Sequence, residues 1–141
     1  MKISTGKKVI PTKVLIYGVE GIGKTTLASK FPKPLFIDVE NGSSNYNVQR
    51  FDEIPSSWNM LLNQIKYVYD NPEICETLVI DSFDWAEKLC KNHINKTKGW
   101  SSIGDPDWGK GYTELETVFG KFLNMLDEII NRGINVFLLS V

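Results

Sequence analysis

Residues 18–25 read GVEGIGKT, which completes the glycine-rich phosphate-binding pattern GxxxxGK[ST]. The apolar run before it, 13–17, favours a β-strand, and the run after it, 25–31, can begin a helix. Glycines allow the backbone to wrap closely round an anion and to aim its N–H groups at phosphate oxygens. The order strand, glycine loop, helix therefore predicts a site for the phosphates of a nucleotide.

The side chains of this loop have separate expected roles. We expect Lys24 to reach the β- and γ-phosphates, the Thr25 hydroxyl to hold Mg²⁺, and Thr26 to lie near the α-phosphate. The predicted nucleotide-binding residues are Gly18, Val19, Glu20, Gly21, Ile22, Gly23, Lys24, Thr25 and Thr26. The alternative is a glycine turn that holds no ligand, and the strand and helix around the loop disfavour it.

The bulk properties exclude several classes of protein. A chain of 141 residues is long enough for one domain with a core, so we expect a single domain over 1–141. The net charge of −1 excludes a global basic field for nucleic acid. Cys75 and Cys90 lack CxxC spacing and are expected to be reduced core thiols. With neither a signal peptide nor an apolar run of about 20 residues, we expect a cytoplasmic protein without a membrane partner.

Strand and helix patterns alternate along the chain. Nearly continuous apolar runs, typical of parallel strands buried on both faces, occupy 14–17, 35–39, 77–81 and 134–141. Helical spacing of apolar residues is found over 57–69, 84–96 and 113–131. The stretch 99–111 is irregular and rich in Gly, Ser, Asp and Trp. The alternation predicts an α/β fold with a mainly parallel sheet.

Three carboxylates stand at the ends of apolar runs. Asp81 ends the run 77–81 and is the favoured second holder of Mg²⁺, although it could instead cap the next helix. Asp38 is its rival, at the end of 35–39. Glu40 could orient the water that attacks the γ-phosphate, or could be a solvated loop residue. The residues alone leave both roles of Glu40 open.

Two of these segments resemble the RecA-type ATPase core. FIDVE at 36–40 resembles the strand that ends in its catalytic glutamate, and LVIDS at 78–82 resembles its Walker B strand. Residues 12–141 as a whole resemble phage-encoded nucleotide-binding ATPases of the AAA/RecA type, related to RecA-like single-strand annealing proteins. Further matching pieces are GKGYTEL at 109–115 and RGINV at 132–136, and GKGY is the more particular of these matches.

This resemblance implies a P-loop NTPase fold, a three-layer sandwich of RecA/AAA type. Numbering the four expected strands along the chain, their order would be 1-4-3-2, with 35–39 at the edge. Kinase- and GTPase-type P-loop proteins instead place the first and Walker B strands side by side, and periodicity does not separate the two orders. Members of the family continue beyond the last strand, so we expect a core truncated at its C-terminus that lacks a further strand.

The resemblance also implies a function. It favours ATP with Mg²⁺ over GTP, with Lys24, Glu40 and Asp81 as catalytic residues and with Thr25 and Asp81 as metal holders. ATP hydrolysis would serve phage DNA recombination or replication, in the cytoplasm of the host cell. One alternative is a nucleotide-dependent DNA-binding or assembly module without significant turnover. Another is a small P-loop kinase, although two arginines, Arg50 and Arg132, are few for an arginine-rich lid.

The region 96–112 is the candidate surface for single-stranded DNA. It interleaves lysines with Trp100, Trp108 and Tyr112, and bases stack on such aromatic side chains. The alternative is a loop whose tryptophans pack on the sheet edge. In a homo-oligomer with ATP near a subunit interface, Lys110 could replace an arginine finger. The only histidine, His93, falls on an apolar helix side and is expected to be a packed or partly exposed residue, not a base or a metal ligand.

Overall fold

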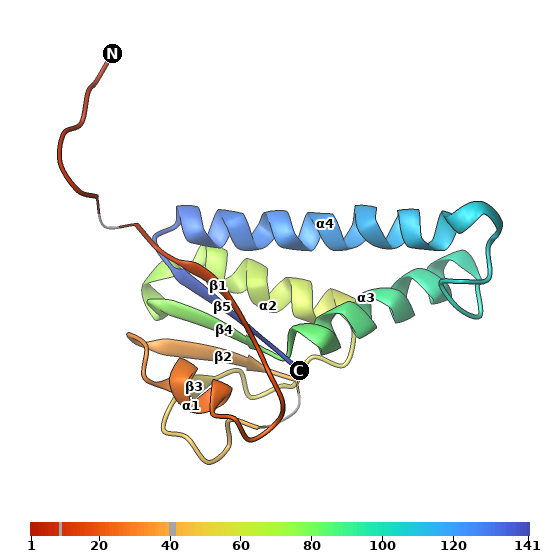
Figure 1. Ribbon diagram of the computed structural model, residues 1–141, viewed down its shortest axis with the longest axis horizontal. Coiled ribbons are helices and arrows are strands. Elements are labelled where there is room, and N and C mark those ends of the chain that lie inside the picture. The colour runs from red at the N-terminus through yellow and green to blue at the C-terminus, as the bar shows by residue number, and fades with distance from the viewer. Residues whose placement is uncertain (9, 40–41) are drawn as a thin grey trace.

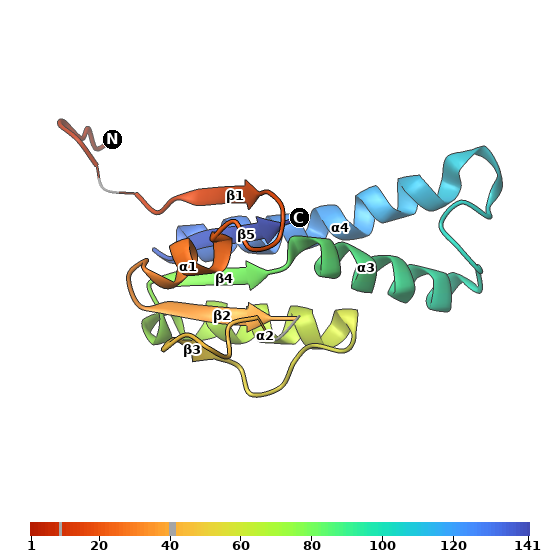
Figure 2. The ribbon, with the colours of Figure 1, turned by 60° about the horizontal axis from the view of Figure 1, so that its bottom comes forward.

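The computed structural model of the chain describes residues 1–8, 10–39 and 42–141. Within these residues, five parallel strands form one sheet in the order β1-β5-β4-β2-β3 (Figure 2). Their bounds are β1 Lys13–Tyr17, β2 Pro34–Asp38, β3 Gln49–Arg50, β4 Thr77–Asp81 and β5 Asn135–Ser140. Because all strands run the same way, their carboxyl ends meet at one edge of the sheet.

Helices cover both faces of this sheet. The bounds are α1 Lys24–Ser29, α2 Trp58–Asp70, α3 Phe83–Lys98 and α4 Lys110–Asn131, with short 3-10 turns η1 Pro72–Ile74 and η2 Asp107–Gly109. The three long helices lie on one face and α1 lies on the other (Figure 1). This three-layer arrangement confirms the predicted α/β P-loop NTPase fold.

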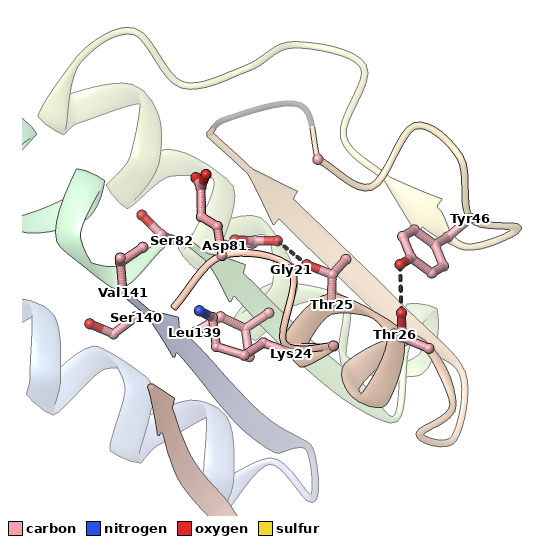
Figure 3. Close-up of a pocket in the computed structure, with 13 residues that line it drawn as sticks. Gly21, Lys24, Thr25, Thr26, Tyr46, Asp81, Ser82, Leu139, Ser140 and Val141 are labelled. Carbon is pink, nitrogen blue, oxygen red and sulfur yellow. Dashed lines mark hydrogen bonds between the residues drawn. The ribbon is translucent and has the colours of Figure 1, made fainter. Parts of the chain in front are cut away.

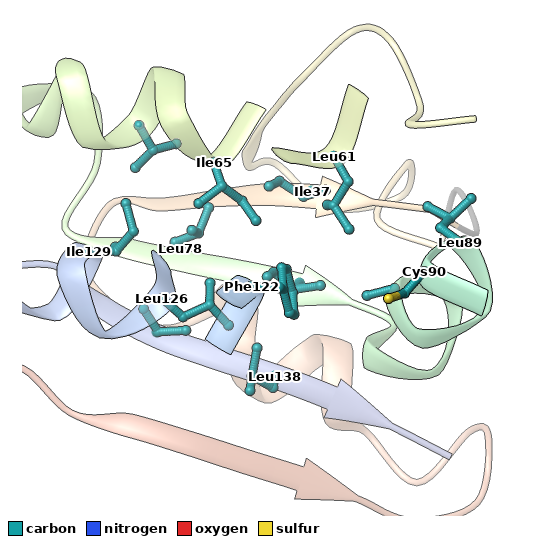
Figure 4. Close-up of a cluster of buried hydrophobic side chains, with 14 of the residues drawn as sticks. Ile37, Leu61, Ile65, Leu78, Leu89, Cys90, Phe122, Leu126, Ile129 and Leu138 are labelled. Carbon is teal, nitrogen blue, oxygen red and sulfur yellow. The ribbon is translucent and has the colours of Figure 1, made fainter. Parts of the chain in front are cut away.

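The larger core lies between the sheet and the three long helices. Leu78 of β4 lies in it with Leu61, Phe122 and other buried residues (Figure 4). Ile80 of the same strand belongs to this cluster too. A smaller cluster on the other face joins Ala28 of α1 to the strands. Successive side chains of a strand point to opposite faces. Because both faces are covered, the central strands read as continuous apolar runs in the sequence.

The order predicted for the four recognised strands is confirmed, with two corrections at the edges. β3 pairs with β2 through Leu35 opposite Gln49 and Phe36 opposite Arg50, so β2 is not the edge strand. A strand of two residues is too short to show any periodicity, which is why the sequence did not reveal it.

The other correction concerns β1, which was expected to be buried on both faces. Its Val14 and Ile16 pack against the smaller core, whereas Leu15 and Tyr17 are 50% and 75% exposed. β1 ends the described sheet and pairs only with β5 there. An edge strand receives less cover from neighbouring elements, so apolar content alone overestimated its burial.

The two longest helices extend together beyond the sheet and are joined by the turn that contains η2 (Figure 1). Gly111, expected to be irregular, lies in the first turn of α4 and is buried. A Cβ at this position would overlap the backbone carbonyl of Ile103, so only glycine allows this close approach.

In the described part of the chain, no helix has the length and apolar character needed to cross a bilayer.

Candidate functional site

The glycine loop connects β1 to α1 at the carboxyl edge of the sheet. Gly21 and Gly23 have φ angles of 81° and 103°, a conformation in which a side chain would be strained. The Gly18 N–H donates to the Ser140 carbonyl of β5 over 3.2 Å, which ties the start of the loop to the sheet. Gly21 and Gly23 therefore take a backbone conformation that favours glycine.

A cavity of about 360 Å³ opens beside this loop (Figure 3). One wall is lined by Glu20, Gly21 and residues 23–26, and another by Asp81 and Ser82. Three of the predicted binding residues, Gly18, Val19 and Ile22, are not part of the lining. Val19 and Ile22 are instead largely exposed, so any contribution from these positions would come from the backbone.

Lys24 lies at the cavity with its cationic end against the loop backbone. Its ammonium group donates to the carbonyl of Gly18 and, over 3.2 Å, to that of Val19. Among the described residues, no carboxylate lies within ion-pair distance of it. A half-buried cation bonded only to neutral carbonyls suits an anionic ligand such as a phosphate chain.

Thr25 and Asp81 meet across the cavity. The Thr25 hydroxyl donates to one carboxylate oxygen of Asp81 over 3.0 Å, and Asp81 is 9% exposed (Figure 3). Since the hydroxyl proton points to Asp81, the lone pairs of Thr25 can face a cation. A hydroxyl and a carboxylate are oxygen ligands of the kind that Mg²⁺ accepts when nucleotide phosphates and waters complete its octahedron. The residues present therefore fit a magnesium–nucleotide complex.

The described residues supply no alternative metal cage, because no group of three or more His, Cys, Asp or Glu side chains gathers among them. His93 is half-buried on α3 and does not line the cavity. Cys75 and Cys90 are free, buried thiols, and burial raises the pKa of Cys75 to about 11 and that of Cys90 to about 12. Such thiols stay protonated near neutral pH, which makes them poor metal ligands.

Asp38, the rival of Asp81, holds a loop. Its carboxylate accepts hydrogen bonds from the Gly42 N–H over 3.0 Å, from the Ser43 N–H over 2.7 Å, and from the Ser43 hydroxyl. Asp38 stands opposite Asp81 in the sheet register but does not line the cavity. The sequence contained a signal for this role, because Asn41-Gly42 is a turn dipeptide placed soon after the strand.

Two contacts at the cavity were missed from the sequence. The Tyr46 and Thr26 hydroxyls lie 2.6 Å apart, and Tyr46 lines the cavity. At the other side, Asp84 of α3 accepts from the Ser140 hydroxyl and, over 2.9 Å, from the Val141 N–H. Both contacts join residues distant in the chain, and neither has a local sequence pattern.

Glu40, the predicted water-orienting residue, lies outside the described residues.

The aromatic region 96–112 divides into two parts. Trp100 is half-buried and packs against the larger core. Trp108 and Tyr112 are 95% and 62% exposed at the tip of the α3–α4 pair. Hydrogen bonds from Ser101 and Ser102 lower the pKa of Asp105, so this carboxylate is engaged within the turn. The structure thus exposes two of the three predicted stacking residues.

Comparison with known proteins agrees with this fold. The family model of the AAA domain matches residues 10–141, nearly the whole chain. A search of curated proteins finds no match. The matched range contains the glycine loop, all five strands and both residues of the Thr25–Asp81 contact. The chain therefore belongs to the AAA domain family, a family of P-loop ATPase domains.

Proposed function

We propose that this chain binds ATP with Mg²⁺ in the cavity beside the glycine loop and hydrolyses it. The observation that carries the proposal is the 3.0 Å contact between Thr25 and Asp81. It brings the two expected metal-holding oxygens together next to Lys24, on the wall of one cavity. Membership of the AAA domain family supports the same function.

The roles follow from charge and position. Lys24 and the loop N–H groups stabilise negative charge on the phosphates as it shifts during phosphoryl transfer to water. Bound Mg²⁺ would neutralise charge on the β- and γ-phosphate oxygens, and Thr25 and Asp81 are the residues that would hold it. Glu40 follows β2 by two positions and is the proposed residue that orients the attacking water.

Release of inorganic phosphate from ATP tests hydrolysis and the role of Glu40 together. We expect Glu40→Gln to lower turnover by about 100-fold or more while ATP affinity stays within a few-fold, because general-base catalysis contributes on this scale. The exposed Glu53, changed to Gln, is the matched control. Equal turnover in the two variants would contradict the role of Glu40. Binding without any turnover would favour a nucleotide-dependent assembly module.

The proposed setting is phage DNA recombination or replication, with single-stranded DNA bound at the tip of α3 and α4. Trp108 is almost fully exposed and Tyr112 is exposed, and the same stretch of the chain carries the exposed Lys96, Lys98 and Lys110. Exposed aromatic rings next to cations suit stacked bases and their phosphates. Because Gly111 packs tightly on Ile103, the tip presents these rings from a fixed backbone.

Anisotropy of a labelled oligothymidine tests this DNA surface. We expect Trp108→Ala to weaken binding by about 5- to 100-fold, the effect of losing one stacked base. Tyr67→Ala, at an exposed aromatic residue of α2, should leave the affinity unchanged. Equal affinities of the wild type and the Trp108 variant would contradict a stacking role.

The arginines argue against the kinase alternative. Arg50 donates to the carbonyls of Ser43 and Tyr46, and Arg132 donates to the carbonyl of Tyr69. Both are used inside the chain, so neither is presented as part of a phosphate-binding lid.

In a homo-oligomer with ATP near the interface, the exposed Lys110 is the proposed cation from the neighbouring subunit. Sedimentation with and without ATP and Mg²⁺ would detect such assembly.

A further inference from the structure

The loop after β2 brings a tyrosine to the glycine loop. Tyr46 lines the cavity, and its hydroxyl lies 2.6 Å from the Thr26 hydroxyl (Figure 3). Thr26 directly follows Thr25 and is the residue expected near the α-phosphate. Tyr46 closes the side of the cavity opposite Ser140 and Val141. Its position therefore corresponds to the α-phosphate end of a bound nucleotide.

The backbone around Tyr46 is fixed from both strands that flank the loop. At the β2 end, Asp38 accepts from the N–H groups of Gly42 and Ser43. At the β3 end, one guanidinium nitrogen of Arg50 donates to the Ser43 carbonyl over 2.8 Å and to the Tyr46 carbonyl over 2.7 Å. The Tyr46 N–H also donates to the Ser43 carbonyl over 2.9 Å. Asp38 and Arg50 thus hold Tyr46 beside the cavity.

The two hydroxyls form a suitable contact for a phosphate oxygen. Together they carry two protons, and the bond between them uses one. The other proton remains for an outside acceptor, and a phosphate oxygen bonded in this way makes a charge-assisted hydrogen bond. A phenol is a stronger acid than an aliphatic alcohol, which makes Tyr46 an effective donor. A purely structural brace would not need to stand on the wall of the cavity.

We propose that Tyr46 is a nucleotide-contacting residue whose hydroxyl, paired with that of Thr26, donates to the phosphate group nearest the nucleoside. This inference rests on the proposed nucleotide site and adds a residue outside the glycine loop to it. Asp38 and Arg50 act as positioning residues, because Arg50 bonds Tyr46, Asp38 bonds its loop, and neither lines the cavity.

The test is the affinity for ADP with Mg²⁺, measured by calorimetry. Tyr46→Phe keeps the ring and removes only the hydroxyl, and we expect it to raise the Kd about tenfold, as for one lost hydrogen bond to a charged group. Tyr67→Phe, at the exposed tyrosine of α2, is the matched control and should bind as the wild type does. The thermal midpoint of each variant without ligand shows that the fold is kept.

A second readout separates direct contact from bracing. The chain has five tyrosines, so their ¹³Cζ NMR signals can be assigned by single Tyr→Phe changes. We expect ADP with Mg²⁺ to shift the Tyr46 signal and to leave that of Tyr67 in place. The inference would be overturned if the wild type bound ADP but its Tyr46 signal did not shift and the Tyr46→Phe variant bound ADP with the same Kd. Failure of the wild type itself to bind would instead overturn the proposed nucleotide site, and this inference with it.

Discussion

Thr25 and Asp81 are 56 positions apart in the chain, yet the hydroxyl of one donates to the carboxylate of the other over 3.0 Å. Thr25 is the last residue of the glycine loop and the second residue of α1, and Asp81 is the last residue of a fully buried strand. The parallel sheet produces the contact, because it collects loop and strand ends at one edge. The proposal of a magnesium–nucleotide site depends on this contact between Thr25 and Asp81.

The two strand-end aspartates are predicted to differ in what they support. Asp81→Asn should weaken Mg²⁺-dependent ATP binding by about 10- to 100-fold, because it removes the negative charge that accepts from Thr25 and that would face the proposed metal. Asp38→Asn should leave the Mg²⁺ dependence unchanged and lower the free energy of unfolding by about 1–3 kcal/mol, because its loop loses a buried acceptor. Titrations of Mg²⁺ at fixed ATP, with urea unfolding of both variants, check the pair. Reversed effects would exchange the two roles.

Two glycines of α4 offer a matched comparison of packing. At Gly111 an added methyl would overlap the Ile103 backbone, so Gly111→Ala should destabilise the protein by about 1–3 kcal/mol. At Gly120 no atom lies within 4 Å of an added Cβ, and Gly120→Ala should stabilise the helix by about 1 kcal/mol. Urea unfolding measures both. Similar effects at the two positions would mean that α4 does not begin against Ile103.

The cysteines give a prediction that depends on pH. Burial raises the pKa of Cys75 to about 11 and that of Cys90 to about 12, against an ordinary 9.0. The folded protein should therefore react only slowly with a thiol reagent at pH 8, and both thiols should react once urea unfolds the chain. Fast reaction of either thiol in the folded protein would contradict its burial.

The same raised pKa values affect stability. Above pH 9 the unfolded chain releases thiol protons that the folded chain retains, which favours unfolding. The contribution of the two thiols is thus complete below pH 9 and decreases as the pH rises towards 11–12. Replacing both cysteines with alanine should remove this part of the decline in unfolding free energy. An identical decline in the double variant would show that other groups cause it.

Local patterns in the sequence were enough to identify the glycine loop and Asp81 as candidate site residues. The glycine loop has a fixed spacing, and Asp81 ends an apolar run long enough to be recognised as a buried strand. Together with the family resemblance, they led to the correct order of four strands. Tyr46 was missed because its meeting with Thr26 depends on how a loop folds back from β2. The loop itself is held by Arg50, which lies on a strand of two residues.

Exposure was harder to predict than strand position. Trp100 and Trp108 occur in the same polar stretch, yet one packs on the core and the other is almost fully exposed. The two tryptophans differ because the backbone turns at Trp108, which has a positive φ of 61°. This turn comes just before the start of α4, where Gly109 and Gly111 lie. Composition treats the two tryptophans alike, whereas the backbone path separates them.

Calorimetric titration with ATP·Mg²⁺, and in parallel with GTP·Mg²⁺, tests the central claim most directly. We predict that the wild type binds ATP in preference, that Lys24→Ala loses binding, and that Lys30→Ala, at an exposed lysine after the same helix, binds as the wild type does. These results would place the ligand at the glycine loop. Equal ATP binding by the wild type and by Lys24→Ala, or no binding by the wild type, would contradict the account.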